Sequence, residues 1–128
     1  MGDAMNLTTL LSAAISIKGV RSAAVVSSDG LVLEGASRDA QDPQDLGFAG
    51  GLLVSALASS RVLAGLLGEG ELSQAMLEYE TGPVLLIPLS AREDAPVMVA
   101  TLEATSALGR ARMGLRKLLP DIAQAAGA

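Results

Sequence analysis

A chain of 128 residues, half of them hydrophobic but with one Phe, one Tyr and no Trp, predicts a single domain over residues 1–128 with an aliphatic core. The lack of His and Cys excludes a His-based triad, a thiol nucleophile and the usual zinc site. A formal net charge of −5 argues against nucleic-acid binding, which needs a basic surface. No secretory signal is recognisable, so we expect a cytoplasmic protein.

The first third of the chain predicts a helix followed by a hairpin. Residues 6–17 have one apolar face, with Asn6 as the expected N-cap and Gly19 at the far end. Two β-rich runs then flank Ser-Asp-Gly at positions 28–30, where Gly30 accepts the positive φ of a tight turn. We interpret this turn as structural rather than as a metal or phosphate loop, because no second ligand is near it.

The segment from Asp45 to Gly68 predicts a long helix that is apolar on more than one side. Asp42 or Asp45 is expected to cap it, and Arg61 is its only internal charge. Apolar residues form two groups along it: Leu46, Leu53, Leu57 and Ala64 in one, and Phe48, Leu52, Val62, Leu63 and Leu66 in the other. A row of small residues, which would let another backbone approach closely, follows a spacing of four: Gly47, Gly51, Ser55 and Ser59.

This helix has three interpretations. A run of about 20 apolar residues is the usual requirement for a membrane span. Arg61 interrupts the run, glycines and serines dilute it, and its flanking charges are acidic rather than basic. We therefore favour a helix packed between two subunits over a membrane span, and over a helix buried wholly within one chain.

The second half predicts three strands and a last helix. Alternation over 72–80 indicates a half-buried edge strand, and residues 81–83 indicate a turn. The continuous apolar run 84–87 indicates a central strand covered on both faces, and residues 97–102 predict another apolar strand. Ser106 is the expected cap of the last helix, which Pro120 should kink or end.

Four of the nine basic residues fall within this last helix: Arg110, Arg112, Arg116 and Lys117. We interpret them as a solvated face near a helix C-terminus, where the dipole favours positive charge. The alternative is a docking site for an acidic partner.

The element order α-β-β-α-β-β-β-α predicts an α+β fold, a five-stranded antiparallel sheet with helices on both faces. If the first and last helices share one face, the long helix covers the other and its far side stays uncovered. A two-fold homodimer solves this problem, because one patch then serves both subunits, with the edge strand pairing its copy. The predicted dimer interface is Gly47, Phe48, Gly51, Leu52, Ser55, Ser59, Val62, Leu66, Met76 and Glu78.

At the level of residues, GVRSAAVVSSDGLVLEG at positions 19–35, the apolar helix and the Tyr79…Thr81-Gly82-Pro83 hairpin resemble the Roadblock/dynein light chain family. The resemblance implies a profilin-like α/β sandwich and a homodimer in which the sheet runs across both subunits and the second helices pack together. It also implies a regulator or scaffold of a Ras-like small GTPase, with a GTPase-activating role as one form of regulation.

We therefore expect a non-enzymatic homodimer that binds a Ras-like small GTPase, with no cofactor, no metal and no membrane insertion. Any stimulated hydrolysis would use the GTPase's own residues, since no arginine finger stands out. The alternative function is a small-molecule sensor domain of a signalling system. A sensor needs an apolar pocket with convergent polar groups, and the strands offer few besides Gln74, Tyr79 and Thr101.

Overall fold

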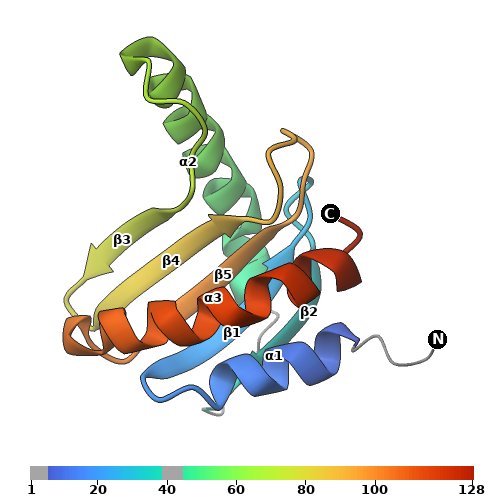
Figure 1. Ribbon diagram of the computed structural model, residues 1–128, viewed down its shortest axis with the longest axis vertical. Coiled ribbons are helices and arrows are strands. Elements are labelled where there is room, and N and C mark those ends of the chain that lie inside the picture. Colours follow the sequence, from blue (N-terminus) through green and yellow to red (C-terminus); the bar gives the residue numbers. More distant parts are fainter. Residues whose placement is uncertain (1–5, 39–44) are drawn as a thin grey trace.

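The computed structural model describes residues 6–38 and 45–128, the first five residues of the second stretch by backbone alone. The order of elements matches the sequence prediction (Figure 1). In chain order they are α1 (Leu7–Ile15), β1 (Val20–Val26), β2 (Val32–Ser37), α2 (Asp45–Leu67), β3 (Ala75–Tyr79), β4 (Gly82–Pro88), β5 (Val97–Leu102), a 3-10 turn η1 (Thr105–Ala107) and α3 (Leu108–Ala125).

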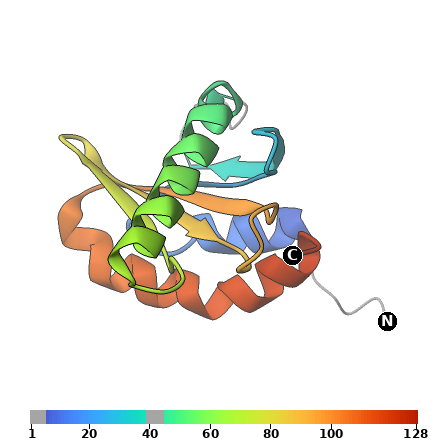
Figure 2. The ribbon, with the colours of Figure 1, turned by 90° about the horizontal axis from the view of Figure 1, so that it is seen from above.

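The five strands form one antiparallel sheet in the order β2-β1-β5-β4-β3. Helices α1 and α3 lie side by side on one face, and α2 crosses the other face (Figure 2). The predicted α+β class and the assignment of helices to faces are therefore confirmed. Within the described residues β2 and β3 each pair on one side only, so both outer edges of the sheet are open.

The sheet separates two hydrophobic cores of unequal size. The larger core lies under α1 and α3, and its buried members include Leu10, Leu11 and Leu115. The smaller core lies on the α2 face and consists of Val26, Leu57, Leu86, Val97 and Val99. Strand β4 serves both cores, because Leu85 and Ile87 face one and Leu86 faces the other. This two-sided burial is the reason its sequence is continuously apolar.

The N-terminus of α1 is capped as the sequence predicts. The Asn6 side-chain oxygen accepts a hydrogen bond from the Thr9 backbone N–H at 2.9 Å, which satisfies one of the free amides of the first turn. We expect Asn6→Ala to lower the free energy of unfolding by about 1 kcal/mol, measured by urea denaturation. Asn6→Asp keeps an acceptor oxygen and is the matched control. An Asn6→Ala protein as stable as wild type would show that the cap contributes nothing.

The start of α2 meets the β1–β2 turn backbone to backbone. Gly30 has φ +88° in that turn, and a Cβ added at Gly50 would lie 2.1 Å from the Gly30 carbonyl oxygen. Such an approach is open only to two glycines. This contact fixes where α2 crosses the sheet. From there the helix runs on, and its C-terminal turns project past the sheet (Figure 1).

Several local predictions need correction. Ser106 does not cap α3: it lies inside η1, whose turn continues directly into the helix, and Ala107 is the N-cap residue without a side-chain bond. Pro120 does not end α3, which continues to Ala125; the proline lies on the exposed side, where water can reach the carbonyl that loses its donor. Strand β3 covers only Ala75–Tyr79 of the predicted 72–80, and β4 already begins at Gly82.

The N-terminal boundary of α2 is only partly described. Asp45 is the first helical residue, and the other expected cap, Asp42, lies outside the described residues.

Candidate functional site: an exposed apolar face of helix α2

Helix α2 packs on the sheet with one side and exposes apolar residues on the other. Leu57 is buried in the smaller core, where Leu53 also packs. On the opposite side Leu52 is 75% exposed, Val62 64% and Leu66 80%. Among the described residues, members of one expected apolar group therefore face the sheet and members of the other face outward.

The row of small residues lies within the outward group. At about 100° per residue, Gly51, Ser55 and Ser59 fall within roughly a quarter of the helix circumference, and all three are exposed. We call the surface formed with their apolar neighbours the α2 stripe: Gly51, Leu52, Ser55, Ser59, Val62 and Leu66. Gly47 and Phe48 belong to the same predicted interface, but their side chains lie outside the described residues.

The same helix has the length and composition of a membrane span. The window Gly50–Leu67 is long and apolar enough to cross a bilayer, and 11% of it is buried. Its inner side nevertheless carries Leu57, which is 1% exposed against the sheet. The middle of α2 is therefore held against the sheet on one side, whereas its last turns extend past the sheet (Figure 1).

The two predicted interface residues on β3 face away from the α2 stripe. Ala75 and Leu77 pack toward the smaller core, so by alternation Met76 and Glu78 point to the sheet face that carries α1 and α3. Met76 is 41% exposed, and the Glu78 carboxylate accepts a hydrogen bond from the Thr105 hydroxyl at 3.2 Å. What β3 shares with the stripe is the open backbone edge of the strand rather than these side chains.

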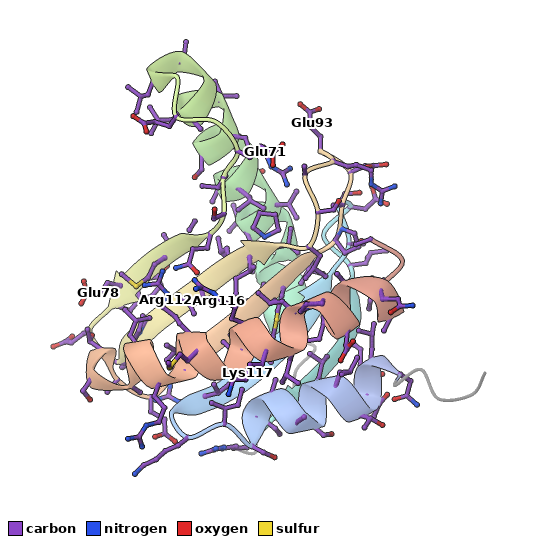
Figure 3. The ribbon with its side chains drawn as sticks, viewed as in Figure 1. Glu71, Glu78, Glu93, Arg112, Arg116 and Lys117 are labelled. Atoms are coloured by element: carbon purple, nitrogen blue, oxygen red, sulfur yellow. The ribbon has the colours of Figure 1, made fainter. Side chains whose placement is uncertain are left out.

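The four basic residues of α3 do not form one cluster. Arg112 and Arg116 lie on the flank of α3 next to β3 and β4, and Lys117 lies on the flank toward α1 (Figure 3). The Gln74 amide oxygen, in the orientation that suits its neighbours, accepts from Arg112 Nε at 3.2 Å and Nη2 at 2.9 Å. Near the start of α3, Arg110 and Lys18 both line a cavity of about 400 Å³.

Two consequences follow for the predicted docking site. The prediction that the four basic residues lie near a helix C-terminus is wrong. They occupy the first turns and the middle of α3, and the last turn of α3 has no basic residue. An acidic partner would meet Arg112 and Arg116 on one flank of α3, with Lys117 on the other flank and Arg110 near the helix start, not one patch.

The polar residues that a sensor would need do not converge. Gln74 contacts Arg112 on the α3 side of the sheet. Thr101 lies on the α2 side, where its hydroxyl is hydrogen-bonded to that of Ser22 on the neighbouring strand β1. Tyr79 is 56% exposed at the edge. In the described part of the chain, no group of three or more Asp or Glu residues could hold a metal ion.

A contact that the sequence analysis missed joins α2 to the β4–β5 loop. Arg61 Nη1 donates to the backbone carbonyl of Glu93 at 3.3 Å, across 32 positions of sequence. Beside this contact lies a cavity of about 380 Å³ lined by Ala58, Arg61, Val62 and Glu93. In the sequence, Arg61 stood out as the only internal charge of the helix, but no neighbouring residue indicated that it would contact the β4–β5 loop.

With this geometry established, comparison with solved structures finds the same fold in several bacterial proteins. An MglB with a tetrameric arrangement superposes with a TM-score of 0.80 at 22% identity, covering 93% of this chain and 86% of that one. The gliding protein MglB from Thermus thermophilus gives 0.79 at 21%, covering 93% and 87%. MglB from Myxococcus xanthus gives 0.79 at 16%, covering 92% of each.

At these identities the structures establish the fold. Among curated protein sequences none matches significantly. The family model of the Roadblock/LC7 domain matches residues 7–93, which include the hairpin, α2 and β3. This chain therefore belongs to the Roadblock/LC7 family.

Proposed function

We propose that this protein is a non-enzymatic homodimeric regulator or scaffold that binds a Ras-like small GTPase in the cytoplasm. The observation that carries the proposal is the α2 stripe, an apolar surface on a helix whose other side is packed on the sheet. Contiguous exposed apolar surface of this kind marks interaction sites on soluble proteins.

A second copy of the chain is the cover that the stripe fits best. A two-fold contact needs a self-complementary patch, and small residues flanked by Leu52, Val62 and Leu66 allow two α2 helices to approach closely. The open edge of β3 follows α2 in the chain and could be closed by its own copy. A solved MglB of this fold has a tetrameric arrangement, which supports self-association.

The GTPase part of the proposal rests on the family. Bacterial Roadblock proteins act on, or beside, Ras-like small GTPases, as the resemblance of residues 19–35 implies. Because no residue of the sequence stands out as an arginine finger, we propose that any effect on hydrolysis comes from repositioning the GTPase's own side chains. Nothing in the geometry of the described residues favours the sensor alternative, because its polar residues are dispersed.

The test is a pull-down from native extract with tagged full-length protein, once with GDP and once with a non-hydrolysable GTP analogue, read by mass spectrometry. A small GTPase enriched with the analogue supports an effector or hydrolysis-stimulating role. Recovery with both nucleotides supports a scaffold. Recovery of no small GTPase under either condition contradicts the GTPase part of the proposal.

A further inference from the structure

Arg61 is held in an unusual way for a surface arginine. It is the only charged residue of α2 beyond Asp45, and it lies half-buried between the helix and the β4–β5 loop. Its Nη1 donates to the Glu93 carbonyl, whereas its Nη2 is buried and reaches no acceptor in the described part of the chain. Buried donors are almost always paired in folded proteins, so an unpaired one points to an interaction made with something else.

No carboxylate of the described residues neutralises this guanidinium. Glu71 lines a smaller cavity of about 180 Å³ beside Arg61 but forms no ion pair with it. Glu93 contributes its backbone carbonyl, and its side chain stands at the tip of the loop, pointing away from the sheet (Figure 3). Arg61 therefore carries a positive charge that no ion pair of the described residues neutralises, although this chain has a net negative charge.

The cavity beside Arg61 opens at the border of the α2 stripe. Ala58 and Val62 line it together with Arg61 and Glu93, and Val62 is also a member of the stripe. A side chain that enters would therefore have both apolar side chains and the guanidinium within the same cavity. An arginine in such a place suits a carboxylate, whose two oxygens match its planar donors and form charge-assisted hydrogen bonds.

We propose that this cavity binds a carboxylate side chain of the partner GTPase, with Arg61 as the residue that recognises it. The inference rests on the proposed function. A second copy of the chain is a poorer source of the carboxylate, because the only Asp or Glu of α2 is Asp45, the first residue of the helix. We therefore assign the α2 stripe to the contact with the second copy, and Arg61, on the flank of the stripe, to the contact with the GTPase.

The test compares Arg61→Met with wild type for binding to the purified small GTPase recovered in the pull-down, by isothermal titration calorimetry. Methionine keeps an aliphatic stem for packing and removes the charge. We expect the dissociation constant to rise about tenfold or more, as for loss of one charge-assisted hydrogen bond. Arg61→Lys should recover part of the affinity, and the salt dependence of binding should be smaller for Arg61→Met than for wild type.

Arg92→Met is the matched control, since Arg92 lies in the β4–β5 loop that Arg61 contacts. Its side chain is 59% exposed, and among the described residues its ion pair is with Asp94 at 3.7 Å. It should bind like wild type. Arg61→Met binding within about twofold of wild type would overturn the carboxylate site alone. Arg61→Met that becomes monomeric would assign the cavity to the second copy, and would also overturn it. A wild-type protein that binds no small GTPase overturns the proposed function and this inference together.

Discussion

Ser55→Arg is expected to convert the proposed homodimer into a monomer of 12.9 kDa. Ser55 lies at the middle of the α2 stripe, between Gly51 and Ser59 one turn away on either side. In a two-fold contact the two new guanidinium groups would face each other in a desolvated interface. An unpaired buried charge costs about 3–5 kcal/mol, so the dimer dissociation constant should rise at least about a hundredfold.

The measurement is sedimentation equilibrium or light scattering over a range of protein concentrations. Gln124→Arg adds the same charge at an exposed position of α3 and should leave the mass of the assembly unchanged. Because Ser55 is exposed in the protomer, the variant should keep its helical circular-dichroism signal. A Ser55→Arg protein with the wild-type mass at every concentration would show that the stripe is not the self-contact.

Gly50→Ala is expected to destabilise the protein strongly, because the added methyl group would collide with the backbone of the β1–β2 turn. The new Cβ would lie 2.1 Å from the Gly30 carbonyl oxygen and 2.9 Å from the Gly30 carbonyl carbon. Gly30 has little freedom to move, since its N–H donates to the Ser27 carbonyl at 2.9 Å within a tight turn of positive φ. Relief therefore requires α2 to shift as a body, and we expect the free energy of unfolding to fall by about 3 kcal/mol.

Gly65→Ala is the matched control in the same helix, because a Cβ there has nothing within 4 Å. It should stabilise the protein by up to about 1 kcal/mol through helix propensity. Urea denaturation of both variants at one fixed protomer concentration keeps any contribution of association constant. Equal stabilities of Gly50→Ala and Gly65→Ala would show that α2 does not depend on the glycine contact.

Much of the fold could be predicted because its signals are local. Strand β5 was predicted with its observed bounds, Val97–Leu102, since this mostly apolar run lies between loop residues. The two-sided character of α2 followed from the same periodicity, because helix geometry alone decides which residues share a side. The Asn6 cap also depends on neighbours within three positions.

The errors come from features that depend on the backbone path or on distant residues. Ser106 has the right chemistry for a cap, but η1 places it one residue inside the turn rather than at the helix start. Arg110 and Arg112 are close in sequence yet point about 200° apart on a helix. The high density of basic residues in this segment of sequence therefore did not produce a cluster on the surface. The Arg61–Glu93 contact joins two elements that no periodicity relates, and only the folded chain reveals it.

The unequal cores imply that this protomer does not open as one unit. The described part of α2 inserts one fully buried leucine, Leu57, into the smaller core, while α1, α3 and the sheet share the larger one. Local unfolding that releases α2 thus costs less free energy than global unfolding, and the rest of the domain remains intact while it occurs. Any molecule that covers the stripe closes this opening, so recognition by α2 and the protection of its amides against exchange are thermodynamically linked.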